Sequence, residues 1–406
     1  MYQAAIRVAS LWNNKAKLWL NGRRDIFDHL NTEIRAQGSK IIWFHCSSLG
    51  EFEQGRPVIE KLKSQHPNFK FLLTFFSPSG YEIRKEYKEV DWVFYLPLDS
   101  RGNAKRFFDI VNPSLVVFVK YDYWYYYLAE CKKRNIPLLL VSGIFRQDQP
   151  FFKWYGNLHR SMLKCFTHFF VQDKESLQFL QSIDINNAIV AGDTRFDRVS
   201  EIADNFTPIG AVEKFCSSAP ILVAGSSWPG DEKLIKDATA NIPNLKIIIA
   251  PHEIHREHLD QLKTIFPDSV LFSQLITHSP EPITSNHLII DNIGMLSKLY
   301  HYATIAYIGG GFSKGIHNTL EAAVYGRPIL FGPNYKKFKE AVGLIETGGG
   351  ICIASSSELS TLLKKFLSDK TALELSGKKS FEFVKQNKGA TEKILYYIEA
   401  NRLLTN

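Results

Sequence analysis

Residues 308–323 read IGGGFSKGIHNTLEAA and directly follow the apolar run Ile305–Ile308. Consecutive apolar residues are typical of a buried strand, and three glycines in a row are typical of a turn. The glycines at 309–311 therefore lie where a strand turns toward a helix, which we expect to begin near His317. Backbone without side chains at such a turn lets a ligand approach closely.

Polar side chains follow the glycines. Asn318 and Glu321 are three residues apart and would share one face of the predicted helix. The pattern predicts either a pocket for an anionic ligand that carries hydroxyl groups or an ordinary capped connection. A dinucleotide fingerprint fits poorly, because the glycines are spaced GxGxxxG and no acidic residue follows about twenty positions later.

The composition indicates a two-domain α/β protein. The chain has 406 residues, of which 45% are hydrophobic, enough for two full cores. With 49 basic and 41 acidic residues the net charge is +8, which suits anionic partners, but no dense basic block with interleaved aromatics indicates nucleic acid. The five cysteines form no CxxC pair, so we expect free thiols and no metal site.

Apolar runs alternate with helix-length polar segments in two series. Runs that are apolar at consecutive positions predict parallel strands covered on both faces. The first series predicts one doubly wound domain over residues 1–205, residues 206–220 predict a linker, and the second series predicts a second such domain over residues 221–406. We leave open whether the last helix packs back on the first domain. The predicted strands are Ile41–Phe44, Phe71–Phe76, Leu115–Val119, Leu138–Val141, Phe169–Val171, Ile221–Ala224, Lys246–Ala250, Leu288–Ile290, Ile305–Ile308 and Pro328–Phe331.

The first twenty residues contain Trp12 and Trp19 with Arg7, Lys15 and Lys17 between apolar positions. Their uncharged runs are too short to span a bilayer. The segment is compatible with an amphipathic helix at a membrane surface and equally with an ordinary packed helix.

Ligands of open α/β sheets bind at the carboxyl ends of strands, so the residues directly after each predicted strand are candidate site residues. Glu51 follows the first strand and is either a general base or a helix-capping carboxylate. Residues 121–127 contain six aromatic side chains, which predict a sugar or acyl platform or part of the core. Residues 225–228, GSSW, predict either a phosphate-binding turn or a plain helix cap.

Five motifs taken together resemble the 3-deoxy-D-manno-octulosonic acid (Kdo) transferases of lipopolysaccharide biosynthesis. The resemblance runs from about residue 20, where Gly22-Arg23-Arg24 is similar to a basic segment of that family, to about residue 350. It implies the GT-B glycosyltransferase fold, with two Rossmann-like domains facing across a cleft. The motifs are SSLGE (47–51), GSSWPGDE (225–232), APHEIHRE (250–257), NIGMLSKLYHYA (292–303) and GGGFSKGIHNTLEAA (309–323).

The resemblance also implies roles for single residues. It makes Glu51 the catalytic base and metal unnecessary. The family's acceptor motif survives only as Asp122 and Trp124, and Ile316 stands where the family has glycine. The donor-binding set that we predict is Gly225, Ser226, Ser227, Pro251, His252, Gly294, Met295, Gly310, Gly311, Asn318 and Glu321. The acceptor-binding set is Ser48, Gly50, Arg56, Lys120, Asp122 and Trp124.

The implied activity is metal-independent, inverting transfer of Kdo from CMP-Kdo to a lipid A precursor, lipid IVA, with no cofactor. The implied location is peripheral, on the cytoplasmic face of the bacterial inner membrane. The nucleotide phosphate would be met by backbone N–H groups near Gly225 and at 309–311. Two alternatives stay open: another GT-B enzyme, a transferase or epimerase that uses a different sugar nucleotide, and a membrane-associated binding protein without turnover.

Overall fold

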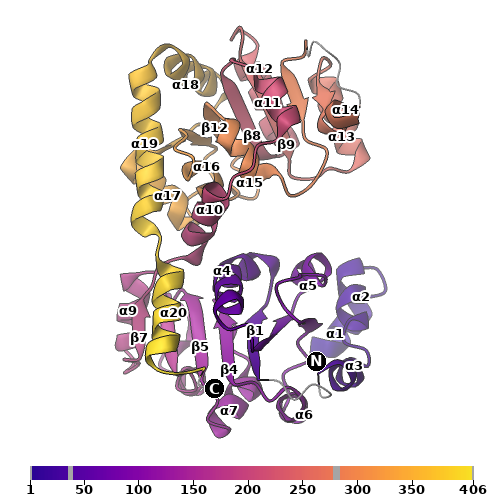
Figure 1. Cartoon of the computed structure of the whole chain (residues 1–406), viewed down its shortest axis with the longest axis vertical. Coiled ribbons are helices and arrows are strands. Elements are labelled where there is room, and N and C mark those ends of the chain that lie inside the picture. The colour runs from indigo at the N-terminus through magenta and orange to yellow at the C-terminus, as the bar shows by residue number, and fades with distance from the viewer. Residues whose placement is uncertain (1, 35–39, 278–283, 405–406) are drawn as a thin grey trace. The chain divides into compact units, whose positions relative to one another are not determined.

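The computed structural model describes residues 2–34, 40–277 and 284–404 of the chain (Figure 1). It divides into two compact units, residues 1–198 with 388–406 and residues 199–387. The chain passes into unit 2 within helix α10 (Thr194–Asp204), ahead of the segment 206–220 that we predicted as a linker. That segment holds helix α11 (Gly210–Cys216), whose Val212 and Phe215 are buried.

Unit 1 contains a seven-stranded parallel sheet in the order β3-β2-β1-β4-β5-β6-β7. Its strands are β1 (Ile41–Cys46), β2 (Lys70–Phe75), β3 (Trp92–Tyr95), β4 (Leu115–Val119), β5 (Leu138–Gly143), β6 (His168–Val171) and β7 (Ala188–Val190). Its helices, with the 3-10 helix η2, are α1 (Tyr2–Ala9), α2 (Asn14–Asn21), α3 (Ile26–Glu33), α4 (Leu49–Gln65), α5 (Pro78–Arg84), α6 (Arg101–Val111), α7 (Tyr125–Lys133), η2 (Pro150–Phe152), α8 (Asn157–Leu163), α9 (Lys174–Gln181) and α20 (Ala390–Ala400).

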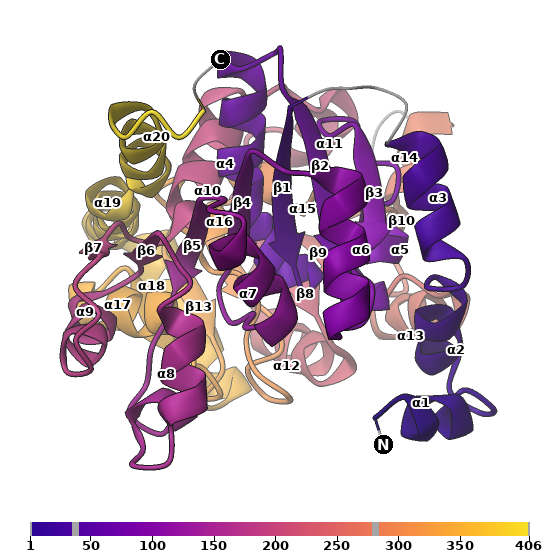
Figure 2. The ribbon, with the colours of Figure 1, turned by 90° about the horizontal axis from the view of Figure 1, so that it is seen from below.

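Both faces of this sheet are covered by helices, which explains why its strands are apolar at consecutive positions. Helices α3, α6 and α7 build the core on one face (Figure 2). Helices α4 and α20 build the core on the other face, with Ile394 and Ile398 of α20 fully or nearly fully buried. The last helix of the chain therefore belongs to unit 1, the arrangement that the sequence left open.

Unit 2 repeats the architecture with a seven-stranded parallel sheet in the order β10-β11-β9-β8-β12-β13-β14. Its strands are β8 (Ile221–Ser227), β9 (Lys246–Pro251), β10 (Val270–Leu271), β11 (His287–Ile289), β12 (Ile305–Ile308), β13 (Ile329–Phe331) and β14 (Gly350–Cys352). Its further helices, with the 3-10 helix η3, are α12 (Pro229–Thr239), α13 (Arg256–Ile265), α14 (Phe272–Thr277), α15 (Leu296–Leu299), η3 (Tyr300–Tyr302), α16 (Leu320–Ala323), α17 (Lys339–Thr347), α18 (Ser356–Ser368) and α19 (Lys370–Asn387).

All ten predicted strands are present, and the prediction of a doubly wound α/β fold is confirmed. Four edge or outer strands were missed: β3, β7, β10 and β14. They have two to four residues, and β7 is only partly buried, so none presents a long apolar run. Within the described part of the chain, no helix is both long enough and apolar enough to cross a membrane.

Candidate active site

Glu51 lies in the first turn of α4, at the carboxyl end of the central strand β1. Its Oε2 atom accepts hydrogen bonds from the backbone N–H groups of Ser47 (2.5 Å) and Ser48 (3.2 Å). This is the capping arrangement that we gave as one interpretation of Glu51. The neighbouring Gly50 is exposed, and a Cβ atom added there would meet no atom within 4 Å. Open space therefore adjoins the turn that carries the carboxylate.

Asp122 lies next to this turn, because β4 is the neighbour of β1 in the sheet. The Ser47 hydroxyl donates a hydrogen bond to Asp122 Oδ1, and Asp122 Oδ2 lies 3.1 Å from His45 Nε2. Trp124 Nε1 donates to the same His45 Nε2 at 3.0 Å. The structure thus brings together three residues that the sequence predicted separately, Glu51, Asp122 and Trp124.

The environment of Glu51 changes its acidity. Burial and, next, the nearby charge of Asp122 raise the pKa of the Glu51 carboxyl to about 7. The two backbone hydrogen bonds and the charge of Lys120 oppose this rise. A carboxyl group with a pKa near neutrality exchanges a proton readily at physiological pH. The capping role of Glu51 is therefore observed, and the acidity of its carboxyl is compatible with the role of a base as well.

His45 is the functional residue that sequence reasoning missed. It is fully buried in β1, and its Nδ1 atom lies 2.8 Å from Thr74 Oγ1, which also accepts from Trp43 Nε1 at 2.8 Å. This chain of polar groups fixes the imidazole beside Asp122. The signal was present in the sequence, since histidine interrupts the otherwise apolar run of the strand IIWFHC.

Two other predicted acceptor residues differ in their surroundings. Lys120 directly follows β4 with a φ of 69°, a left-handed conformation that is strained for a residue with a side chain. Arg56 instead forms ion pairs along α4, with its Nε 2.7 Å from Glu60 Oε1 and its guanidinium over the Tyr87 ring. Its described contacts hold α4 together and do not involve the Glu51 turn.

The aromatic residues at 121–127 divide between core and surface. Tyr127 is fully buried and donates a hydrogen bond to the Pro97 carbonyl, and Tyr123 packs against the same core. Tyr125 and Tyr126 are exposed at the start of α7. Part of this run is therefore core, and the sugar or acyl platform stays a prediction for the exposed residues.

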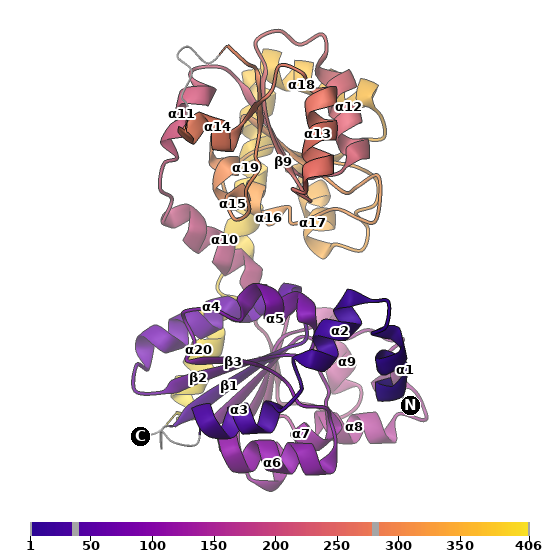
Figure 3. The same ribbon diagram turned by 90° about the vertical axis from the view of Figure 1, so that its right-hand side faces the viewer.

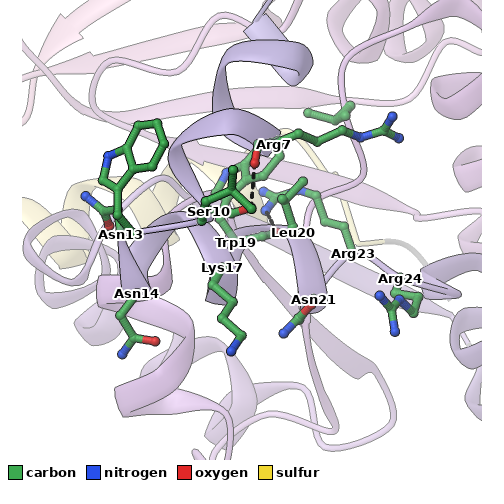
Figure 4. A pocket seen from close by; sticks show the side chains of 13 residues that line it. Arg7, Ser10, Asn13, Asn14, Lys17, Trp19, Leu20, Asn21, Arg23 and Arg24 are labelled. Carbon is green, nitrogen blue, oxygen red and sulfur yellow. Dashed lines mark hydrogen bonds between the residues drawn. The ribbon is translucent and has the colours of Figure 1, made fainter.

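A cavity of about 870 Å³ lies beside α1 and α2 (Figure 4). Its lining combines basic side chains, Arg7, Lys17 and Arg24 among them, with the indole rings of Trp12 and Trp19. Trp19 is buried, whereas Trp12 is 74% exposed. The N-terminal segment therefore contains a packed helix, α2, and the turn before this helix exposes the apolar side chains of Leu11 and Trp12.

Arg23, which also contacts this cavity, has a structural role. Its guanidinium donates to the carbonyl oxygens of Phe76 (2.7 Å) and Leu96 (2.9 Å), which directly follow β2 and β3, and lies 4.1 Å from the Trp19 ring centroid. These contacts fix α2 at the carboxyl ends of β2 and β3. Arg23, the middle residue of the basic segment Gly22-Arg23-Arg24, therefore positions helix α2, whose residues line the cavity.

In unit 2, the segments that follow β9, β8 and β12 lie side by side, because these strands are neighbours in the sheet. Three rings meet there. His252 stacks on Trp228 at 4.7 Å and on His317 at 4.3 Å between centroids, and Trp228 Nε1 donates to His317 Nε2 at 3.2 Å. Burial lowers the pKa of His317 to about 4 and also lowers the pKa of His252. Both rings are neutral at pH 7 and can accept or donate hydrogen bonds.

The glycine turn corrects one expectation. The N–H of Gly309 donates to the Gly225 carbonyl (2.9 Å), and the N–H of Gly310 donates to Asp231 Oδ2 (2.8 Å). These two N–H groups are therefore not available to a phosphate, contrary to our prediction. A Cβ at Gly311 would lie 2.5 Å from Gly332 N. Glycine is needed at this position because turns of the domain approach one another closely.

The GSSW turn is also partly internal. Ser227 is fully buried, and its hydroxyl donates to Glu232 Oε1 at 2.9 Å. His258 Nε2 lies 3.0 Å from Glu232 Oε2, so this buried carboxylate has a second polar partner. Ser227 is therefore a structural residue, contrary to its predicted place in the donor set. Ser226 takes a left-handed φ of 52° at a β-bulge and is only half-buried.

We predict that Gly225→Ala destabilises unit 2 without touching the chemistry of unit 1. A Cβ at Gly225 would lie 1.9 Å from the Tyr300 hydroxyl, a contact that real side chains do not tolerate. We expect a loss of about 1–3 kcal/mol in unfolding free energy. Chemical denaturation measures it, and the double variant Gly225→Ala/Tyr300→Phe should recover part of the loss. Equal stability of Gly225→Ala and wild type would contradict the packing account.

The remaining predicted donor residues lie near this edge of the sheet. Gly294 has a φ of 98° that favours glycine, and Met295 follows it as the N-cap of α15. Helix α16 begins at Leu320, with Thr319 as its N-cap residue, and not near His317. Asn318 Oδ1 accepts a hydrogen bond from the Leu320 N–H (3.1 Å). Asn318 Nδ2 donates to Glu321 Oε1 at 3.1 Å, so the predicted pairing of these two side chains is present.

No group of three or more His, Cys, Asp or Glu side chains placed to hold a metal ion occurs among residues 2–34, 40–277 and 284–404. The side chains gathered in unit 1 are acid–base groups, and those gathered in unit 2 are neutral rings, hydroxyls and amides. Such groups can move a proton in the first case and bind a nucleotide in the second.

Known proteins share these features. Residues 22–198 match the family model described as 3-deoxy-D-manno-octulosonic-acid transferase (kdotransferase). A 3-deoxy-D-manno-octulosonic acid transferase of Rickettsia felis is 26% identical over 372 residues, which cover 88% of this chain and 78% of the relative. The enzyme of the same name from Aquifex aeolicus is 27% identical over 345 residues, which cover 83% of this chain and 89% of the relative.

Solved structures show the same fold. A UDP-GlcNAc 2-epimerase from Neisseria meningitidis bound to UDP-GlcNAc superimposes with a TM-score of 0.63 at 15% identity, covering 89% of this chain and all of the other. A putative UDP-N-acetylglucosamine 2-epimerase from Listeria monocytogenes gives a TM-score of 0.60 at 13% identity, covering 91% and 98%. Identities this low establish the architecture alone.

Two parallel α/β units with these neighbours define the GT-B fold, and residues 22–198 match a family of transferases. It is related to the 3-deoxy-D-manno-octulosonic acid transferases along most of its length, as its motifs indicated.

Proposed function

We propose that the protein transfers Kdo from CMP-Kdo to a lipid A precursor, lipid IVA, in lipopolysaccharide synthesis. The observation that carries the proposal is the Glu51 carboxyl, half-buried beside Asp122 in the part of the chain that matches the Kdo transferase model. Unit 1, with residues 1–198, takes the acceptor, and unit 2 takes the nucleotide-sugar.

Glu51 is the general base. The acceptor hydroxyl gives its proton to the Glu51 carboxylate while its oxygen attacks the anomeric carbon of Kdo, and the bond from that carbon to the CMP phosphate oxygen breaks. Attack opposite the leaving group inverts the configuration at the anomeric carbon. The Ser47 hydroxyl holds Asp122 by a hydrogen bond, and burial together with the charge of Asp122 keeps the pKa of Glu51 high enough to take the proton.

The donor site lies at the ends of β8, β9 and β12. Ser226, His252 and His317 are the polar groups that we place against the CMP phosphate, in place of the Gly309 and Gly310 N–H groups. Lys314, whose ammonium lies 5.9 Å from the Trp228 ring centroid, supplies the positive charge for the leaving phosphate. Glu321 binds ribose hydroxyls, because a carboxylate next to a phosphate would repel it.

The acceptor is a lipid, which fits the N-terminal cavity. Its lining of Arg7, Lys17 and Arg24 suits an anionic headgroup, and exposed Leu11 and Trp12 suit the interface of a bilayer. We therefore place the protein as a peripheral enzyme on the cytoplasmic face of the inner membrane.

A second candidate is an enzyme that uses a UDP-sugar, because the solved structures with this fold are UDP-GlcNAc epimerases. Calorimetric titration with CMP and with UDP separates the two. The proposal expects CMP to bind at least about tenfold more tightly, a difference of about 1.4 kcal/mol. Preferential binding of UDP would replace the proposal with the second candidate.

The rate of transfer should depend on the protonation of Glu51. A base with a pKa of about 7 is deprotonated only above neutrality, so kcat/KM should rise with pH through about 7 and level off above it. Asp122→Asn removes one of the charges that raise this pKa, so the rising limb should move toward lower pH, by about one unit. The pH profiles of the two forms measure the shift, and an unmoved limb would contradict the coupling.

A further inference from the structure

Two exposed apolar points project from the same side of unit 1. One is the turn that follows α1, with Leu11 and Trp12, and the other is the turn that precedes α8, with Trp154 and Tyr155. The ribbons of α1 and α8 lie on this side of unit 1 (Figures 2 and 3). Trp154 is 89% exposed, more than Trp12. Tryptophan and tyrosine are the residues that prefer the membrane–water interface.

The turn that precedes α8 is held in place by the core and by hydrogen bonds. Phe151 is buried in the core of unit 1 and Phe152 packs against it, whereas Trp154 and Tyr155 point outward with their rings 5.6 Å apart. The turn is closed by Arg160, whose Nη1 donates to the carbonyl oxygens of Phe151 (2.9 Å) and Lys153 (3.0 Å).

The same turn leaves no room for a side chain at its end. A Cβ at Gly156 would lie 2.1 Å from the Pro150 carbonyl oxygen. A clamped, tightly closed turn therefore holds Trp154 and Tyr155 away from the core, and their exposure is not the result of a loose loop.

The sheet topology places the two points on either side of Glu51. Helix α2, which follows α1, is fixed by Arg23 at the ends of β2 and β3, and the turn at 150–156 lies beyond the end of β5. Glu51 and Asp122 follow β1 and β4, which stand between β2 and β5 in the sheet. The candidate active site therefore opens between the two apolar points.

The excess of positive charge lies in the same two segments of the chain. Residues 1–24 hold five basic and no acidic residues, and residues 146–164 hold four basic residues and one acidic residue. The rest of the chain contains 40 basic and 40 acidic residues, so the whole net charge of +8 resides in these segments. Positive charge beside exposed aromatic side chains complements an anionic lipid surface and would not favour a neutral apolar partner.

We propose that the turn 150–158, with Trp154, Tyr155 and Leu158, is a second membrane contact that acts together with α1. The two contacts seat unit 1 on an anionic bilayer on both sides of Glu51, so that a lipid headgroup rises between them toward the carboxylate. The proposal rests on the proposed function for its lipid acceptor, but vesicle binding itself requires no turnover.

Vesicle flotation of the full chain tests this contact. With vesicles of phosphatidylethanolamine and phosphatidylglycerol, Trp154→Ala/Tyr155→Ala should bind at least about tenfold more weakly than wild type, as should Leu11→Ala/Trp12→Ala. The matched control is Tyr396→Ala, which removes a 73% exposed aromatic from α20 and should bind like wild type. Equal binding of the Trp154 variant and wild type would overturn the proposal.

Fluorescence quenching tests the insertion of Trp154 with a milder substitution, so that a folding defect does not decide the result. Brominated lipids should quench the fluorescence of wild type more than that of Trp154→Phe, which retains an aromatic ring at this position. Equal quenching of the two forms would also refute insertion of Trp154. If the Trp154→Ala/Tyr155→Ala variant instead changes the oligomeric state in sedimentation, the turn is a protein interface and the membrane contact is wrong.

The failure of this inference is distinguishable from the failure of the proposed function. Kdo transfer by a Trp154→Ala/Tyr155→Ala variant that binds vesicles normally would reject only the second contact. Vesicle binding that depends on Trp154 without any transfer from CMP-Kdo would reject only the assigned reaction.

Discussion

The Glu51→Gln variant is expected to lose transfer by about 10³-fold while it still folds and binds CMP. A glutamine amide keeps an oxygen for the N–H groups of Ser47 and Ser48, so the first turn of α4 remains capped, but it cannot take a proton. Single-turnover assays with excess enzyme measure the loss. Glu86→Gln, which changes an exposed carboxylate in the same unit, is the matched control and should retain full activity.

The same variant should be more stable than wild type at alkaline pH. The pKa of Glu51 is raised in the folded protein from its ordinary value of 4.5 to about 7, so ionisation costs folding free energy as the pH rises through this range. Glutamine carries no such cost. Allowing for the access of water to this half-buried group, we expect a gain on the order of 1 kcal/mol at pH 8 and none at pH 4. Thermal denaturation at the two pH values tests the sign.

Retained turnover in Glu51→Gln would contradict the assigned role, whatever its stability. A loss of both activity and CMP binding would indicate misfolding, and thermal denaturation of the variant would then test the role of Glu51. Inactivity together with higher stability at pH 8 is the combined result that only a buried, ionised base explains.

The second large effect is expected at Glu321. Removal of a carboxylate that receives ribose hydroxyls loses hydrogen bonds to a charged group, each contributing about 1.5–3 kcal/mol. Glu321→Ala should therefore raise the KM for CMP-Kdo by about 10- to 100-fold and change kcat much less. Steady-state kinetics at varied donor concentration measure the split.

Asn318 orients the Glu321 carboxylate, because its amide nitrogen donates a hydrogen bond to Glu321 Oε1 at 3.1 Å. Asn318→Ala should give a smaller increase in the donor KM than Glu321→Ala. Glu346→Ala, at an exposed position of α17, serves as control. An unchanged donor KM in Glu321→Ala would remove this residue from the donor site.

The fold was predictable because its signal is local. Runs such as Ile41–Phe44 and Ile305–Ile308 are apolar at every position, and only strands buried on both faces need this pattern. The short strand β7 and the return of α20 to unit 1 were not predictable with confidence from local patterns. Their positions depend on long-range contacts, such as the Asp197 carboxylate that accepts from Gly389 N–H and Thr391 N–H at the start of α20.

The candidate site was predictable in part. The rule that ligands bind after strands placed Glu51, Asp122 and His252 at the carboxyl ends of parallel strands, and the structure has them there. The same rule could not tell that the N–H groups of Gly309 and Gly310 point into the domain, because glycine-rich turns that bind phosphate and those that allow close packing have the same sequence. Only the hydrogen bonds to Gly225 and Asp231 separate the two cases.

The central claim is tested most directly by mass analysis of the product formed from CMP-Kdo and lipid IVA by the purified protein. The account predicts an acceptor that gains the mass of Kdo, release of CMP, and no product from Glu51→Gln under the same conditions. An unchanged acceptor with wild-type protein that binds CMP, or an equal yield from Glu51→Gln, would contradict it.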